Sequence, residues 1–597
     1  MVGGQGYAGG HFELIEDGYI GSGVYNNGWN IAPNYRVYFC GHFDQPIESK
    51  RTFTGHNETL YSYGEETATN GTYRQGGVFT FTEETVISRV GISFISTDKA
   101  CKNVESEIPK GTEMQSLVEK AQENWNANIF RKFTTTEKNE TTLTQLYSYL
   151  YGMNLLPSNR TGENPGWTSD KPYYDDFFTL WDLFRCSTSL WQIIQPQAYE
   201  EIIRGLIDIW RHEGWLPDAR SSNFNGATQG GSNADIVLAD AYVKGVRGAV
   251  NWEDGYAAVK KDAEVTPPNN DDPRAPDSST KQGRGALPDW KEIGWITPKY
   301  TRAVSRAVEY AIDDFGVSQI AAGLGMDDDA AKYLNRSRQW RNHWNPDQDS
   351  LGFSGFVVPR YAKEAGFAND SFVEPYDPLQ CGGCYWSDPY YEDPPWAYSF
   401  NAYHDVYFLI QLSGGGERFV ERLEKFFEPG VDEDNTEHGE TLYDVANEPA
   451  FTTPYLFNFA GRQDLSVKYS RRAALTYFGA EADGLPGNSD AGAMQTWILW
   501  SMIGLYPVTG QTTFLIGSPW LEHLVIDLGG GKNLTITGGK KDEAYYVQSL
   551  KVNGEAWDRA WLTFEDIFAE GGTLDFVLGE EPVRWANGTL PPSPASG

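Results

Sequence analysis

The chain has 597 residues, of which 82 are acidic and 48 are basic, so its formal net charge at pH 7 is −34. This charge excludes a typical nucleic-acid-binding surface, which needs clustered lysine and arginine. The sequence also contains neither an apolar run long enough to span a bilayer nor a basic amphipathic anchor, so no membrane partner is expected. Its length predicts two or three domains.

Residues 1–110 are predicted to form a β-sandwich. Short β-branched and aromatic runs such as YRVYFCGHF (35–43) alternate with clusters of Gly, Asn and Thr, a pattern typical of strands joined by turns. From about residue 112 the apolar residues recur at helical spacing, as in the stripe from Ile202 to Trp210 that stops at Gly214. After Pro507 the alternation has a period of two, which predicts a C-terminal β-layer over 508–597.

Several predicted helices are joined by long connections rich in Gly, Pro, Asp, Asn and Trp. Loops of this length inside a compact domain are usually functional or disordered, and these carry too many aromatic residues for disorder. In a ring of antiparallel helical hairpins, alternate connections lie at the same end. We therefore predict an α/α toroid over 111–507 with one elaborated face. The long connections are 214–233, 263–299, 345–396, 428–452 and 479–490.

Two acidic residues on these loops are candidates for acid–base chemistry. Glu392, in YYEDPPWAYSFNAYHD (390–405), lies among aromatic residues and prolines, which disfavour a charged carboxylate and keep a general acid protonated. Asp490, in DGLPGNSDAGAMQTWILW (483–500), precedes a helix, where it is expected to stay ionised and to act as a general base. Glycoside hydrolysis needs such a pair. Because the chain has 82 acidic residues, such a pair also arises by chance. The alternative for Asp490 is a helix cap.

A third loop, TLYDVANEPAFTTPYLFNFAG (441–461), contains Asn447 and Glu448 directly before Pro449. Amide and carboxylate oxygens are hard donors that suit Ca²⁺. On spacing alone, however, ordinary helix capping explains this loop equally well. A metal site here is therefore one of two interpretations.

The cysteines and glycosylation sequons concern the cellular compartment. Cys381 and Cys384 have no second CxxC pair or histidine beside them, so a local disulfide or two unrelated thiols is expected rather than zinc. Sequons are typical of secreted proteins, whereas the opening residues show no signal peptide. We expect a secreted protein whose N-terminus is missing, with an intracellular protein as the alternative. The sequon asparagines are Asn57, Asn70, Asn139, Asn159, Asn335, Asn369, Asn533 and Asn587.

Seven segments of the chain are informative when they are taken together and in order. They are FFTLWDLFR (177–185), GWLPDAR (214–220), ADIVLADAYVKG (234–245), YYEDPPWAYSFNAYHD (390–405), ANEPAFTTPYLFNFAGR (446–462), DGLPGNSDAGAMQTW (483–497) and IGLYPVTG (503–510). No single segment is specific, but the ordered set resembles the calcium-dependent exo-α-mannosidases of glycoside hydrolase family 92. The resemblance covers about residues 90 to 580.

The resemblance implies a multidomain fold: an N-terminal β-sandwich, an (α/α)6 catalytic barrel and a C-terminal β-layer. It implies hydrolysis with inversion at the anomeric carbon and one Ca²⁺, with Glu392 as general acid and Asp490 as general base. Asn447 and Glu448 fall on the metal-binding loop. The expected substrate is terminal mannose of N-glycans or mannans, with α-1,2 linkages as the first expectation.

Further residues are expected to bind the sugar. Trp181 and Asp182 fall where the family holds the terminal mannose, and four others lie on the same loops as the two proposed catalytic carboxylates. For His404 and Asp405 a packed, purely structural pair is the alternative. The four loop residues are Trp396, His404, Asp405 and Asn488.

The sequence departs from the family pattern at several places. Asn488-Ser489-Asp490 lacks a second loop acid, and Asp444 stands where members that cleave α-1,2 linkages tend to have a histidine. The family's opening glycine-rich segment is not found, so the sandwich is predicted to be incomplete. Two alternatives remain: a mannosyl-phosphate uncapping hydrolase, which needs no general acid and is therefore disfavoured by Glu392, and an inactive mannose-binding relative.

Overall fold

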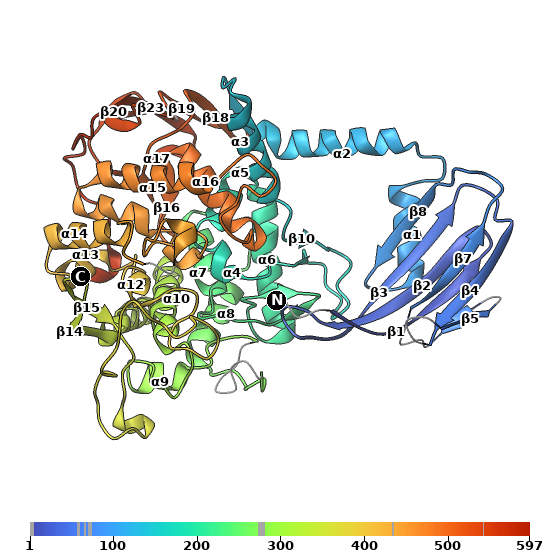
Figure 1. Cartoon of the computed structure of the whole chain (residues 1–597), viewed down its shortest axis with the longest axis horizontal. Helices are drawn as coiled ribbons and strands as arrows, with labels where there is room; N and C mark the ends of the chain where they lie inside the picture. The colour runs from blue at the N-terminus through green and yellow to red at the C-terminus, as the bar shows by residue number, and fades with distance from the viewer. Residues whose placement is uncertain are drawn as a thin grey trace. The chain divides into compact units, whose positions relative to one another are not determined.

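The structure is a computed structural model that describes residues 5–56, 60–64, 67–69, 74–272, 281–432, 435–540 and 542–597. It confirms the predicted layout, a β-rich N-terminal part followed by a helical part and C-terminal strands (Figure 1). The chain divides into two compact units. The first comprises Met1–Asn126, Ser158–Phe178 and Arg220–Ala227, and the second comprises Ala127–Pro157, Thr179–Ala219 and Thr228–Gly597.

The N-terminal unit contains two β-sheets with aromatic side chains between them. The ring of Phe79 in the smaller sheet lies 5.9 Å from Tyr19 and 4.9 Å from Phe43 of the larger sheet, measured between centroids. Because aromatic rings bury large apolar areas, this layer forms the core of a β-sandwich. The larger sheet has the order β6-β1-β2-β3-β8 and the smaller β5-β4-β7. The strands are β1 (Gln5–Ile15), β2 (Gly18–Asn27), β3 (Ala32–Phe43), β4 (Ser49–Gly55), β5 (Tyr61–Gly64), β6 (Thr67–Thr69), β7 (Gln75–Thr80) and β8 (Ser88–Ser93).

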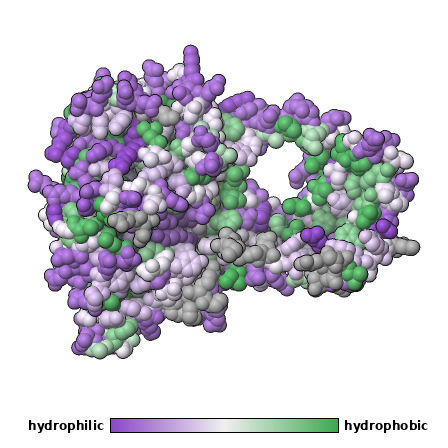
Figure 2. All heavy atoms as spheres, in the orientation of Figure 1, coloured by the Kyte–Doolittle hydropathy of each residue, from purple (hydrophilic) through white to green (hydrophobic). Residues whose placement is uncertain are grey.

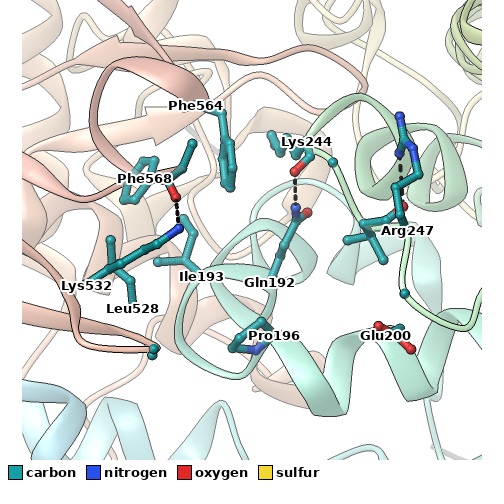
Figure 3. A pocket seen from close by; sticks show the side chains of 16 residues that line it. Gln192, Ile193, Pro196, Glu200, Lys244, Arg247, Leu528, Lys532, Phe564 and Phe568 are labelled. Carbon is teal, nitrogen blue, oxygen red and sulfur yellow. Dashed lines mark hydrogen bonds between the residues drawn. The ribbon is translucent and has the colours of Figure 1, made fainter.

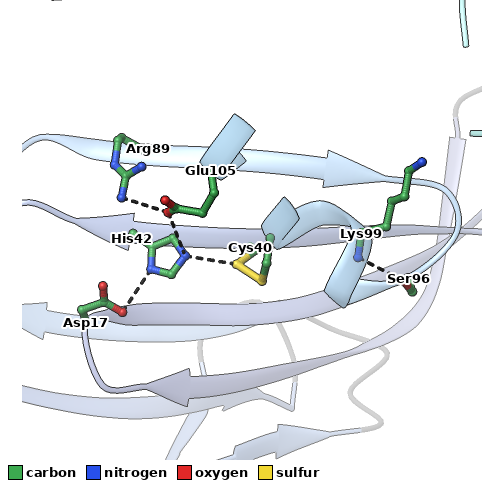
Figure 4. Close-up of a disulfide and its surroundings, with 8 residues drawn as sticks. Asp17, Cys40, His42, Arg89, Ser96, Lys99 and Glu105 are labelled. Atoms are coloured by element: carbon green, nitrogen blue, oxygen red, sulfur yellow. Dashed lines mark hydrogen bonds and ion pairs between the residues drawn. A yellow bond between two sulfur atoms is a disulfide. The ribbon is translucent and has the colours of Figure 1, made fainter. Parts of the chain in front are cut away.

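Helix α1 (Thr97–Glu107) packs on the larger sheet, and the Cys40–Cys101 disulfide ties it there (Figure 4). A Cβ on Gly91 in β8 would lie 2.2 Å from the carbonyl oxygen of Ala100, so only glycine allows this close approach. The next helix is α2 (Met114–Asn128), which buries none of its residues.

Two later segments, 158–178 and 220–227, belong to the N-terminal unit, although the prediction assigned them to the toroid. The Asn30 side-chain amide donates to the carbonyl oxygens of Ser221 at 2.6 Å and Phe224 at 2.7 Å. These partners are more than 190 residues from Asn30 in sequence, which a local pattern does not reveal. The segments form two hairpins, β10 (Ser158–Asn159) with β11 (Tyr174–Asp175) and β12 (Arg220–Ser221) with β13 (Phe224–Asn225).

The helical unit is organised around helices that are buried on every side. In α10 (Ala303–Gly323), 18 of 21 residues are buried, and every residue of α16 (Ala493–Ile503) is buried. Helix α6 (Pro196–Glu213) is amphipathic, and it ends at Gly214, as predicted, with a left-handed φ of 85°. The other α-helices are α3 (Glu140–Gly152), α4 (Leu180–Leu183), α5 (Ser187–Ile194), α7 (Ala234–Val243), α8 (Trp252–Glu264), α9 (Leu287–Glu292), α11 (Asp327–Arg336), α12 (Pro395–Tyr398), α13 (Val406–Leu412), α14 (Gly416–Phe426), α15 (Gln463–Tyr477) and α17 (Phe564–Ile567).

The predicted C-terminal β-layer packs on this helical unit, in contact with α5 and α15. Its larger sheet has the order β21-β20-β23-β19-β18-β9 and includes a strand from the start of the unit, and a smaller sheet has the order β16-β17-β22. Within the helical connections, β14 (Trp344–Ser350) and β15 (Phe353–Val357) form a hairpin. The strands of the layer are β9 (Phe133–Thr135), β16 (Leu505–Pro507), β17 (Thr513–Ile516), β18 (His523–Gly529), β19 (Lys532–Thr537), β20 (Tyr546–Val552), β21 (Glu555–Trp557), β22 (Trp561–Thr563) and β23 (Gly572–Gly579).

The visible surface of the helical unit is mainly hydrophilic (Figure 2). None of the helices in the described ranges is both long and apolar enough to cross a membrane. Sequon residues Asn57 and Asn70 lie outside the described residues. The other six sequon asparagines are exposed to solvent, namely Asn139, Asn159, Asn335, Asn369, Asn533 and Asn587.

Candidate active site

Glu392 lies on the loop between β15 and α12, with its carboxylate held by two donors. The indole N–H of Trp181 donates to Oε2 at 2.7 Å, and the side-chain amide of Gln229 donates to Oε1 at 2.8 Å. The Glu392 backbone has a φ of 69°, a left-handed conformation uncommon outside glycine. Its N–H donates to the Cys384 carbonyl oxygen at 2.8 Å. Backbone and side chain are therefore both fixed.

The environment of Glu392 favours its protonated form. The pKa of this carboxyl is raised to about 7, and burial is the largest cause. The negative charge of Asp490 also raises it, while the hydrogen bonds from Trp181 and Gln229 and the charge of Arg185 lower it. The rise that the aromatic sequence context predicted is thus present, with burial as its largest cause. A carboxyl with this pKa can donate a proton near neutral pH.

Three other acids converge in the same unit. Asp182 of α4, Glu448 and Asp490 each place a carboxylate oxygen within 4.8 Å of the other two. Glu448 and Asp490 begin two short 3-10 turns, Glu448–Ala450 and Asp490–Gly492. Both carboxylate oxygens of Asp182, and Oε1 of Glu448, are buried without a hydrogen-bond partner among the described residues. Such groups are costly unless a cation or a ligand satisfies them.

Like charges and burial act together on these acids. Burial raises the pKa of Asp182 and of Glu448 well above the ordinary range, and each is raised further by its neighbours, Asp490 and Glu392 among them. Burial also raises the pKa of Asp490, while a hydrogen bond with Glu448 lowers it. Burial is thus the largest effect on the pKa of Asp490, and it acts against the lowering that a helix N-terminus was expected to produce.

The Asp490 side chain is not a helix cap. Ser489 has this role, because its hydroxyl accepts from the backbone N–H of Gly492 at 3.2 Å. Asp490 and Ala491 instead adopt left-handed backbone conformations in succession, with φ values of 39° and 55°. Left-handed conformations at non-glycine residues cluster at functional sites. Asn488, a predicted sugar contact, is exposed two residues before Asp490.

Asn447 joins two of the loops. Its side-chain N–H group donates to the Glu392 carbonyl oxygen at 3.3 Å and to Oδ2 of Asp444 at 3.0 Å. Asp444 also lies 3.1 Å from Nδ1 of His438. The predicted metal-binding loop and the predicted acid loop are therefore in direct contact.

Three predicted sugar contacts have their side-chain partners outside this cluster. Trp396 is fully buried and donates to Ser350 Oγ at 3.0 Å. His404 and Asp405 are also fully buried, and Asp405 pairs with Arg341 at 2.7 Å. These contacts do not support a sugar-binding role for the three side chains, and that role stays a prediction. The alternative given for His404 and Asp405, a packed structural role, fits the observed burial.

The sequence analysis did not identify Gln229. Thr179 orients it: the threonine hydroxyl donates to Oε1 of Gln229 at 2.6 Å and accepts from the backbone N–H of Trp181 at 3.1 Å. This leaves the amide N–H group of Gln229 to face Glu392. The long connection 214–233 was predicted to be functional, but nothing in its pattern marked this residue.

A separate cavity of about 450 Å³ lies among α5, α6 and the turn that joins β18 to β19 (Figure 3). The Gln192 side-chain amide donates to the Lys244 carbonyl oxygen at its wall, and the Lys532 ammonium donates to Ala569. None of the residues that line this cavity is among the clustered acids or their partners.

Comparison with known proteins gives two family matches. The glycosyl hydrolase family 92 N-terminal domain matches residues 2–93, and the glycosyl hydrolase family 92 catalytic domain matches residues 99–580. An uncharacterized secreted glycosidase of Arthroderma benhamiae is 34% identical over 550 residues, which is 88% of this chain. The chain spans 65% of the length of that relative.

Solved structures share the fold. A family GH92 α-mannosidase from Bacteroides thetaiotaomicron has a TM-score of 0.84 and 24% identity, over 99% of this chain and 77% of that one. A family GH92 inverting mannosidase from the same species has a TM-score of 0.82 and 23% identity, over 97% of this chain and 78% of that one.

The clustered charges predict a pH-dependent stability. A carboxyl whose pKa is higher in the folded chain than in the unfolded chain destabilises the fold as the pH rises above its unfolded pKa of about 4.3 for Glu. In metal chelator, Glu448→Gln should therefore stabilise the protein at pH 8, on the order of 1–3 kcal/mol, and change it little at pH 5. Thermal unfolding at both pH values measures this, with exposed Glu417→Gln as the control. Equal shifts at the two pH values would contradict it.

Proposed function

The chain belongs to glycosyl hydrolase family 92, and we propose that it is a calcium-dependent exo-α-mannosidase that inverts the anomeric carbon. The observation that carries the proposal is a contrast between neighbouring carboxyls. Glu392 accepts hydrogen bonds at both oxygens and has a pKa near 7, whereas three other acids converge within 4.8 Å of one another. A proton donor beside a concentration of negative charge suits hydrolysis of a glycosidic bond.

The three converging acids fit a hard divalent cation. Oε1 of Glu448 is buried without a partner among the described residues, and carboxylate and amide oxygens are preferred Ca²⁺ ligands. Glu448 and Asn447 are the residues that would hold the ion. When bound, Ca²⁺ supplies positive charge for vicinal sugar hydroxyls and favours a flattened ring. Asp182 then has two buried oxygens available to accept from hydroxyls of the terminal mannose.

The residues of the chain divide the reaction between them. Glu392 donates its proton to the oxygen of the departing group, and Asp490 accepts a proton from the attacking water. Trp181 and Gln229 hold the Glu392 carboxyl in one orientation through their hydrogen bonds. Water attacks on the face opposite the departing group, so the configuration at the anomeric carbon inverts.

Substrate and compartment are also parts of the proposal. Terminal α-mannose of N-glycans or mannans is the proposed substrate, and α-1,2 linkages remain the first candidate. His438 lies 3.1 Å from Asp444, so a histidine stands beside the position that often holds one in members that cleave α-1,2 linkages. Six exposed sequon asparagines, together with a relative that is called a secreted glycosidase, support secretion.

A mannosyl-phosphate uncapping hydrolase is the second candidate. A phosphate leaving group needs no protonation, so such an enzyme has no use for a carboxyl with a raised pKa. The pKa of about 7 at Glu392 favours the mannosidase. An inactive sugar-binding protein would likewise gain nothing from this carboxyl.

Calcium should be required for activity. Excess EDTA is expected to abolish release of mannose from α-mannobiose, and added Ca²⁺ is expected to restore it. Glu448→Ala should behave as the chelated enzyme does, because a hard-oxygen site weakens sharply when it loses a charged ligand. Calorimetric Ca²⁺ titration should show the same loss, whereas exposed Glu417→Ala should bind normally. Full activity in excess chelator would remove calcium from the proposal.

The first product should be β-mannose. Single displacement by water inverts the anomeric carbon of an α-mannoside. Proton NMR of the anomeric signals, recorded before mutarotation, distinguishes the two products. Initial α-mannose would instead indicate a double displacement through a covalent intermediate.

The two catalytic carboxyls should differ in their dependence on the leaving group. Glu392→Gln should lower the rate of α-mannobiose hydrolysis by about 10²–10⁴-fold. It should lower the rate much less on an aryl α-mannoside with an acidic phenol, because such a phenol departs without protonation. Asp490→Asn should lower the hydrolysis rate by a comparable factor on both substrates, since each reaction needs an activated water.

The pH profile provides the control for this experiment. For the wild type, kcat/KM on α-mannobiose should fall as the pH rises above about 7, where Glu392 loses its proton. This fall of kcat/KM at high pH should be absent for Glu392→Gln on the aryl substrate. If Glu392→Gln lowered the hydrolysis rate equally on both substrates, Glu392 would position the sugar rather than donate a proton.

A further inference from the structure

Tyr385 is an exposed aromatic residue on the loop that carries Glu392. Its relative exposure is 57%, compared with 45% for Tyr151, another exposed tyrosine of the helical unit. Neither the predicted motifs nor the proposed catalytic roles use it. Tyrosine is suited to stacking on sugars because its ring offers an apolar face and its hydroxyl a polar edge.

The loop around Tyr385 is held at several points. Cys381 and Cys384 form a disulfide directly before it. Oδ2 of Asp388 accepts from the backbone N–H groups of Gly383 and Tyr385, both at 2.9 Å. Because these bonds close the loop on itself, Tyr385 projects from a framework that costs little further ordering when a ligand binds.

The same loop is fastened to the start of α10. The Val304 N–H donates to the Pro389 carbonyl oxygen at 3.0 Å. The guanidinium group of Arg302 lies 4.7 Å from the ring centroid of Trp386, the neighbour of Tyr385. Trp386 is buried, whereas Tyr385 is not. The loop therefore anchors one aromatic residue and presents the next one to solvent.

A row of aromatic rings connects Tyr385 to the proposed acid. Tyr385 stacks on Tyr391, with centroids 6.2 Å apart and an interplanar angle of 29°. Tyr391 meets Trp181 edge to face at 6.0 Å, and Trp181 donates its indole N–H to Glu392. Tyr385 is the solvent-exposed end of this row.

The direction of proton transfer indicates which part of the substrate lies near Tyr385. Glu392 gives its proton to the oxygen of the departing group, so the surface on the solvent side of Glu392 faces the leaving sugar rather than the terminal mannose. On the basis of the proposed function, we propose that Tyr385 is the platform of the leaving-group subsite, on which the ring of the departing sugar stacks. It thereby favours substrates whose leaving group is a sugar.

The test compares substrates with and without a leaving-group ring. Tyr385→Ala should lower kcat/KM on α-mannobiose by about tenfold, which corresponds to about 1.4 kcal/mol, and should leave turnover of α-mannosyl fluoride unchanged. Tyr385→Phe should retain activity on both substrates because it keeps the ring. Tyr151→Ala is the matched control, and the pH profile of each variant should follow that of the wild type.

Each outcome decides the matter. Equal loss on both substrates, or a displaced pH profile, would mean that Tyr385 supports Glu392 instead of binding the leaving group, and would overturn the subsite. Unchanged kcat/KM on α-mannobiose would overturn it as well. A wild type that released mannose from neither substrate would overturn the proposed function itself, and the subsite with it. Thermal unfolding of each variant identifies any loss that comes from misfolding.

Discussion

The concentration of buried negative charge is the constraint on which the rest of the site depends. Asp182, Glu448 and Asp490 each place a carboxylate oxygen within 4.8 Å of the other two, and the negative charge of Glu392 raises the pKa of Asp182 and of Glu448. Arg185, the cation whose charge lowers the pKa of Asp182, is itself paired with a helix carboxylate, Glu309, at 3.0 Å. Unpaired buried charges push apart the elements that carry them, so the surrounding fold must hold those elements in place.

Rigid surroundings supply that restraint. Glu392 and Asp490 both have left-handed backbones, a conformation that costs of order 1–3 kcal/mol at each residue. The Cys384 carbonyl holds the first through a backbone hydrogen bond. The second precedes α16, which is buried throughout, and a Cβ on Gly492 at the start of that helix would lie 2.5 Å from Met153. Close packing thus offsets both the strain and the repulsion.

Local patterns predicted the acids but not their partners. Glu392, Glu448 and Asp490 could be selected because aromatic, proline and helix-start signals surround each of them in sequence. Gln229 lies 163 residues from the carboxylate to which it donates, so no local signal identifies it. Trp396 shows the converse: it is close to Glu392 in sequence, but its indole N–H donates to Ser350 of β14 and not to a member of the acid cluster.

The remaining question is how neighbouring acids acquire opposite roles. Burial raises the pKa of both Glu392 and Asp490, so burial alone does not distinguish an acid from a base. Their hydrogen-bond partners do differ: Glu392 is held by the neutral donors Trp181 and Gln229, whereas Asp490 shares a hydrogen bond with Glu448. If Glu448 binds calcium as proposed, the positive charge of the ion favours ionisation of Asp490. Asp490 then becomes the base, and Glu392 keeps its proton.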